Sequence, residues 1–88
     1  MGVGIKIGIA NKSCIIRNEI ISNLNGVEVV SADPFIFANK IEKNTIHGIY
    51  TYTYNDIRCD GRIKTNLSIS GNFECGIFCE GNQNFTRI

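Results

Sequence analysis

The chain of 88 residues has a single proline, no tryptophan and no marked excess of charge of either sign. Nine basic side chains against eight acidic ones give a formal net charge of +1. A nucleic-acid-binding protein ordinarily carries a basic excess on one face, and a membrane-surface segment carries a cluster of Lys and Arg. The balanced charge therefore argues against both nucleic acid and a membrane as partners.

Long apolar stretches are also missing, and none approaches the ~20 residues that span a bilayer. The start, MGVGIKIGIANKS, has no basic leader and only alternates around Lys6, unlike a secretory signal. Lys6 also stands where a myristoylation signal needs Ser or Thr. We therefore expect no signal for export in these residues, and one small domain over 1–88.

Ile and Asn are abundant, and they recur in a shared order three times. The segments are IIRNEIISNLNGV, IFANKIEKNTIHGI and IKTNLSISGNFECGI. Each reads Ile-x-x-Asn, an inner Ile, a second Asn and then Gly before a β-branched residue. The corresponding positions are Ile15, Ile36 and Ile63; Asn18, Asn39 and Asn66; Ile20, Ile41 and Ile69; Asn23, Asn44 and Asn72; and Gly26, Gly48 and Gly76.

The spacing of the repeat predicts a solenoid. Gly4 and Gly26 are 22 residues apart, as are Gly26 and Gly48, and Gly76 follows after 28. In such a fold Ile points inward from short strands and stacks on its equivalents. We expect Asn at the corners, in the left-handed conformation and bonded as a ladder, and Gly with positive φ where the next strand starts. A two-layer antiparallel sandwich with chance recurrence is the alternative.

The repeated residues resemble the right-handed parallel β-helix superfamily, which includes NosD-like, carbohydrate-binding and sugar-hydrolysis domains. The resemblance covers essentially the whole chain. It implies an all-β, right-handed parallel β-helix of about three and a half coils of roughly 22 residues. It also implies a location at the cell envelope or outside the cell. Its members include lyases, epimerases, tailspikes and adhesins, so the fold does not select one activity.

Neither end of the chain has the polar capping unit that a solenoid needs. The strand pattern begins at once with Val3 and Ile5, and Ile88 occupies the first position of a further repeat. We therefore expect uncapped ends, and either a fragment of a longer solenoid or ends that a partner covers. Exposed strand edges predict end-to-end self-association.

Three tyrosines precede the longest gap in the repeat. Tyr50, Tyr52 and Tyr54 alternate with Thr, so we expect them to point outward on one strand, with Glu28 and Phe78 at matching positions of the neighbouring repeats. A row of exposed rings can stack on sugars while its hydroxyls bond to sugar hydroxyls. The alternative is that the rings only cover the sheet or pack under the loop that follows.

That gap predicts a loop around 55–61, because Ile63 follows Gly48 by 15 residues and Ile15 follows Gly4 by 11. Asp60-Gly61 is a turn signal, and loops inserted into solenoids often carry function. Charged residues gather here, and we add them to the tyrosines as candidate ligand-binding residues: Asp56, Arg58, Asp60 and Arg62. The alternative is a solvated turn with local ion pairs.

No catalytic residue, metal site or cofactor is predicted. His47 is the only histidine; it could act as a general base, but it has no evident partner, so a polar surface residue is the simpler interpretation. Cys75 and Cys79 are four apart, which does not fit a zinc site, and Cys79 is expected to point inward. We expect the four cysteines to be free and mostly buried, with a disulfide left open.

The resemblance and the tyrosine row together predict a segment that binds or displays a surface for extended carbohydrate, with a polysaccharide as partner. Two other functions remain open. One is a structural or adhesin-like spacer without a ligand. The other is a truncated part of a polysaccharide lyase or hydrolase whose catalytic residues lie outside the chain.

Overall fold

The computed structural model describes residues 2–55, 57–64, 66 and 68–88. This part of the chain is all-β, with ten strands and no helix. The strands are β1 (Ile5–Ile7), β2 (Cys14–Ile16), β3 (Glu19–Ile21), β4 (Asn25–Val30), β5 (Phe35–Phe37), β6 (Lys40–Glu42), β7 (His47–Tyr52), β8 (Arg62–Lys64), β9 (Ser68–Ser70) and β10 (Cys75–Cys79).

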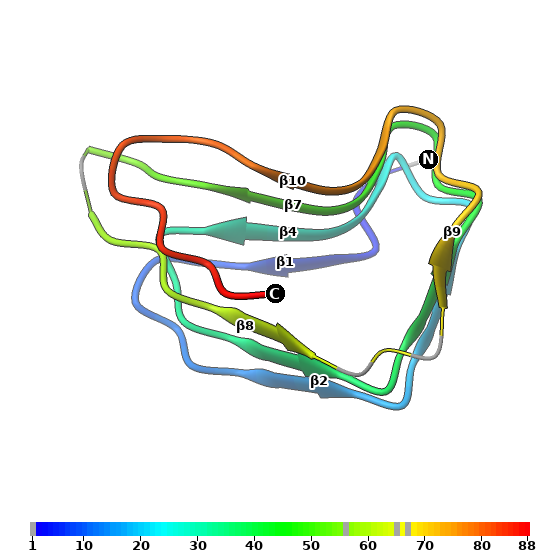
Figure 1. Ribbon diagram of the computed structural model, residues 1–88, viewed down its shortest axis with the longest axis horizontal. Helices are drawn as coiled ribbons and strands as arrows, with labels where there is room; N and C mark the ends of the chain where they lie inside the picture. The colour runs from blue at the N-terminus through cyan, green and yellow to red at the C-terminus, as the bar shows by residue number, and fades with distance from the viewer. Residues whose placement is uncertain (1, 56, 65, 67) are drawn as a thin grey trace.

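The strands form three sheets, and every pairing is parallel and joins two strands that are three apart in chain order (Figure 1). Sheet A has the order β1-β4-β7-β10, sheet B has β2-β5-β8, and sheet C has β3-β6-β9. This parallel arrangement is compatible with a β-solenoid. The antiparallel sandwich is wrong, since every pairing between these strands is parallel.

The pairing register confirms the alignment of the sequence repeat. In each sheet the residues that the repeat makes equivalent are Cα partners. These are Ile15, Ile36 and Ile63 in sheet B; Ile20, Ile41 and Ile69 in sheet C; and Val27, Ile49 and Ile77 in sheet A.

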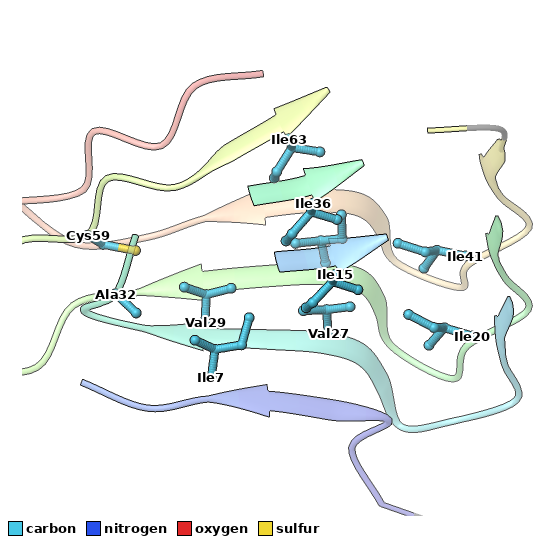
Figure 2. Packing of buried hydrophobic residues seen from close by; sticks show 11 residues of the cluster. Ile7, Ile15, Ile20, Val27, Val29, Ala32, Ile36, Ile41, Cys59 and Ile63 are labelled. Carbon is cyan, nitrogen blue, oxygen red and sulfur yellow. The ribbon is translucent and has the colours of Figure 1, made fainter. Parts of the chain in front are cut away.

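The apolar core lies between the three sheets. Side chains from all three point toward one another, among them Ile36 of β5, Ile41 of β6 and Val27 of β4 (Figure 2). Ile36, Ile41 and Ile49 are fully buried. Burial of each such side chain stabilises the fold by about 1.5–3 kcal/mol before entropy is counted. The core thus receives one buried isoleucine from each sheet of the middle repeat.

Buried asparagines connect successive repeats. The Asn39 Oδ1 accepts the backbone N–H of Asn18 at 2.9 Å, and its Nδ2 donates to the Ile15 carbonyl at 2.8 Å. The Asn44 Oδ1 likewise accepts the N–H of Asn23 at 3.0 Å. Asn39 and Asn44 are both buried, and these bonds satisfy polar groups that would otherwise be costly to bury. The predicted hydrogen-bonded ladder is confirmed.

The left-handed conformation, however, falls on the residue before each of the corner asparagines Asn18, Asn23, Asn39 and Asn44. Arg17, Ser22, Ala38 and Lys43 have φ between 56° and 64°, whereas Asn55 is the one asparagine with positive φ in the described part. The prediction for Asn was wrong because the preceding residue makes the bend. That bend leaves the amide of Asn free to enter the ladder.

Close packing, and not the predicted positive φ, explains the glycines at positions 26 and 48. Gly26 and Gly48 are not among the residues with positive φ. A Cβ on Gly26 would lie 2.6 Å from the Gly48 carbonyl oxygen, and one on Gly48 would lie 2.6 Å from that of Gly76. Contacts below 3.0 Å to backbone are not tolerated, so the approach of the neighbouring strand excludes a side chain.

Candidate functional site

The outer face of sheet A carries two of the predicted tyrosines. Tyr50 and Tyr52 on β7 are half-buried and alternate with the buried Ile49 and Thr51. Their rings stack with centroids 4.9 Å apart and an interplanar angle of 27°. Period-two alternation places both on the solvent side of the strand.

Two further rings extend this pair across the sheet. Phe78 of β10 is the register partner of Tyr50, and their centroids lie 5.6 Å apart. His47, at the start of β7, stacks on Phe78 at 5.0 Å and lies tilted against Tyr50 at 5.5 Å. We call His47, Tyr50, Tyr52 and Phe78 the aromatic cluster. Such offset ring pairs add about 0.5–1.5 kcal/mol each beyond the area that they bury.

Two carboxylates border the aromatic cluster. The Tyr50 hydroxyl donates to Glu80 Oε1 at 2.5 Å. This hydrogen bond, with burial and the negative charge of Glu80, raises the pKa of Tyr50 to about 12. On the other side Glu28 is the register partner of Tyr50 and accepts from Asn25 Nδ2 at 2.9 Å. Hydrogen-bond acceptors therefore lie beside the rings.

His47 belongs to this cluster as a packed ring. Its side chain is buried, and its backbone N–H donates to Asn25 Oδ1 at 3.1 Å. Among the described residues its Nδ1 has no hydrogen-bond partner. A general base needs a group that orients it and access to the proton that it removes. No described carboxylate bonds to the His47 ring, so the geometry offers neither.

Tyr54 does not join the cluster, although the alternation predicted it there. β7 ends at Tyr52, and Tyr54 lies beyond it in an isolated antiparallel bridge to Ile57. It is 53% exposed, and no ring contact involves it in the part of the chain that the structure describes. The chain turns away from the strand direction once β7 ends.

The connection between β7 and β8 spans 53–61 and holds a small ion-pair network. Asp60 Oδ2 lies 3.7 Å from Arg58, and its Oδ1 lies 3.4 Å from Arg87. The Arg58 guanidinium also lies 4.7 Å over the ring of Phe85. Exposed pairs of this kind contribute about 0–1 kcal/mol each. This geometry fits the interpretation as a turn with local ion pairs; Asp56 lies outside the described residues.

Arg62 forms no ion pair with that network among the described residues. It is the first residue of β8, paired with Phe35 on one side and in an isolated parallel bridge with Arg87 on the other. The sequence reasoning missed Arg87, although Ile88 at the first position of a further repeat aligns Arg87 with Arg62. It also missed that Phe35 and Phe37 share an outer face with Arg62 and Lys64, which the repeat alignment could have indicated.

The cysteines differ in part from the expectation. All four are free thiols, but only Cys59 is buried; Cys14 and Cys79 are exposed and Cys75 is half-buried. The prediction of mostly buried thiols was wrong. The inward direction predicted for Cys79 fits its register, but its thiol is exposed. Cys79 is the partner of the buried Thr51, but β10 is an outer strand of sheet A, so no further described strand covers it.

Within the described residues, no group of three or more His, Cys, Asp and Glu side chains could hold a metal ion. That part of the chain also has no helix long and apolar enough to cross a membrane. Comparisons with protein-family models, curated proteins and solved structures find no match.

Proposed function

We propose that the chain is a segment of a right-handed parallel β-helix, of the superfamily that its repeats resemble, and that the aromatic cluster binds an extended carbohydrate chain. Right-handedness rests on a general rule, because parallel crossover connections are right-handed in about 98% of cases. The coil arrangement is supported by the order in which the chain visits sheets A, B and C. About three and a half coils would result.

One observation carries the ligand proposal: stacked aromatic rings lie directly beside hydrogen-bond acceptors. Sugars present apolar ring faces and hydroxyl donors, so a matching surface combines aromatic side chains with acceptors. Tyr50 and Tyr52 supply rings, and the Glu80 carboxylate lies within 2.5 Å of the Tyr50 hydroxyl. Because Glu28 and Glu80 border the cluster, charge repulsion disfavours acidic sugars, and we propose a neutral glycan.

A glycan array probed with the labelled 88-residue protein tests the proposal, followed by titration of any neutral oligosaccharide that binds. Tyr52→Ala should weaken that binding about tenfold, since it removes one stacking surface. Tyr54→Ala is the matched control, because Tyr54 is exposed and outside the cluster, and it should leave the affinity unchanged. Equal losses in both variants, or no glycan bound by the wild-type protein, would reject the proposal.

A structural spacer is the second candidate, and the packing of the rings favours it specifically. Tyr50 is engaged by Tyr52, Phe78 and His47 and by the Glu80 carboxylate, so the cluster covers the outside of sheet A without any ligand. In that case Tyr52→Ala should lower the free energy of unfolding by about 1–2 kcal/mol while no glycan binds the wild-type protein.

A further inference from the structure

The outer face of sheet B differs in composition from the rest of the surface. Its strands β2, β5 and β8 have the sequences CII, FIF and RIK, with the middle isoleucines buried. The outward side chains form two rows in register. We call them together the sheet B face: Cys14, Phe35 and Arg62 in one row, and Ile16, Phe37 and Lys64 in the other.

Three cations converge at one edge of this face. Arg62 and Lys64 are exposed and form no ion pair among the described residues. Arg87 lies beside Arg62 in register. These three side chains line a cavity of about 330 Å³ together with Ile63 and Ile88. No acidic residue among those that the structure describes lines it, so an anionic group is the ligand that its charge favours.

The near-neutral net charge conceals this concentration of positive charge. The three strands of sheet B contain no acidic residue. The glutamates of the chain lie in or next to strands of sheets A and C, at Glu19, Glu28, Glu42, Glu74 and Glu80. The described aspartates, Asp33 and Asp60, lie just before β5 and β8, and Asp60 pairs with Arg87. The expectation of no nucleic-acid partner rested on the average charge, which does not describe this face.

Beside the cations lies an apolar, aromatic surface. The Phe35 and Phe37 rings are half-buried and stack at 5.6 Å with an interplanar angle of 10°. Ile16 is 41% exposed next to them. No outward position of the sheet B face carries a hydroxyl, amide or carboxylate, so sugar hydroxyls would find no acceptor there. A ligand that fits must combine negative charge with flat apolar groups.

The size of the face limits the partner further. Three strands of three residues cover an area of roughly 14 by 10 Å at standard strand spacings. A stable protein partner needs about 800 Å² on each side, which is several times more. The face therefore fits a narrow polymer better than a second copy of the chain or another globular protein.

We propose that the sheet B face binds single-stranded nucleic acid. The phosphates contact Arg62, Lys64 and Arg87, and a base packs against the outer side of the phenylalanine pair. Single-strand binding proteins combine these two elements, a cationic track for the backbone and aromatic rings for the bases. The inference is independent of the carbohydrate proposal, since it uses another sheet and other residues.

Fluorescence anisotropy with a labelled oligothymidylate, titrated at several low salt concentrations, tests the charge contribution. The variant R62Q/K64Q should weaken binding about tenfold or more at the lowest salt. It should also reduce the slope of log affinity against log salt by roughly 1.4, since each single-strand phosphate contact contributes about 0.7. K40Q/K43Q is the matched control on and beside β6 of sheet C, with the same change of charge, and should have little effect.

A second arm tests the stacking contribution and separates nucleic acid from acidic polysaccharide. Phe37→Leu keeps the surface apolar and should weaken binding on the order of fivefold with the salt slope unchanged. A polyuronate competitor should displace the oligonucleotide poorly. Urea unfolding of each variant checks that it is folded. If R62Q/K64Q is destabilised, the single variant Lys64→Gln replaces it.

Three results would overturn the proposal: no binding of oligothymidylate at low salt, equal losses for the sheet B and sheet C variants, or a polyuronate bound as tightly as the oligonucleotide with the same sensitivity to R62Q/K64Q. The last would assign the face to acidic polysaccharide instead.

Discussion

The outer faces of sheets A and B are formed by the same repeats but differ in chemistry. Both carry a pair of stacked aromatic side chains two residues apart, Tyr50 and Tyr52 on β7 and Phe35 and Phe37 on β5. Beside the tyrosines lie the carboxylates of Glu28 and Glu80. Beside the phenylalanines lie the cations Arg62 and Lys64, and no outward residue of these three strands carries a hydroxyl, amide or carboxylate.

The comparison shows how a repeat can separate scaffold from surface. Inward positions are fixed by the core, because Ile36 and Ile49 are fully buried and stack on equivalents in the same sheet. Outward positions on the same strands are under no such constraint. One scaffold can therefore present unrelated chemistry on two faces, and the predictions below test whether the faces are as independent as this implies.

The largest expected effect comes from the scaffold that the two faces share. Asn39→Ala should lower the free energy of unfolding by about 2–4 kcal/mol, because it leaves buried partners such as the Ile15 carbonyl unsatisfied. Asn44→Ala should cost a similar amount at the corner next to sheet A. Urea unfolding measures both, with the exposed Asn82→Ala as control. Unequal losses would mean that the two corners are not equivalent.

The second effect concerns sheet A alone. Tyr50 has its pKa raised to about 12 by the hydrogen bond to Glu80 and by burial. The folded state holds the Tyr50 proton more tightly than the unfolded state does. The contribution of this group to the free energy of unfolding is therefore complete below pH 10 and is lost as the pH rises toward 12. Glu80→Gln should move the ionisation of Tyr50 toward the ordinary value of 10.0. The ultraviolet absorbance of tyrosinate, followed against pH, measures the shift. The ionisation near pH 12 is the late phase of this titration, and its loss in Tyr50→Phe assigns it to Tyr50. A late phase that persists in Glu80→Gln would contradict this assignment.

A third, smaller effect sharpens the description of sheet B. Asp60 lies 3.4 Å from Arg87 and so competes with any anion at that end of the face. Asp60→Asn should strengthen oligothymidylate binding roughly two- to threefold at low salt, because it removes one neighbouring negative charge. Asp33→Asn is the control, since the Asp33 carboxylate accepts a backbone N–H and pairs with no described cation. Equal gains in both variants would indicate a non-specific effect of charge.

The smallest effect is a local protection. Cys14 lies in register with Phe35 on the sheet B face, whereas Cys79 is exposed on β10 of sheet A. Bound oligothymidylate should slow maleimide labelling of Cys14 about twofold or more and leave Cys79 unaffected. Mass spectrometry of the labelled peptides distinguishes the two thiols. Protection of Cys79 alone would place the oligonucleotide on the wrong sheet.

The sequence predicts the strands and their register well, because these depend on a repeated pattern. Aligning Ile15, Ile36 and Ile63 predicts their pairing, and the hydrogen-bonded asparagines follow from the same alignment. The physical reasons assigned to Gly and Asn were less successful. Residue type alone does not distinguish a glycine that avoids a neighbouring carbonyl, such as Gly26, from one that adopts positive φ.

The candidate sites were predicted less completely, since they depend on contacts outside the repeat. Alternation places Tyr50 and Tyr52 on one face, but it cannot show that β7 ends before Tyr54. The contact of Arg87 with Asp60 joins residues 27 positions apart that share no motif. Net charge does not describe the individual faces, because it averages over surfaces that the fold separates.

The most direct test of two independent faces measures both ligands on both variants. Wild-type protein, Tyr52→Ala and R62Q/K64Q are each titrated with a neutral glycan selected on the array and with oligothymidylate. We expect Tyr52→Ala to weaken only glycan binding and R62Q/K64Q to weaken only oligonucleotide binding, each by about tenfold. If either variant weakens both ligands equally while its urea midpoint is unchanged, the two faces are not independent.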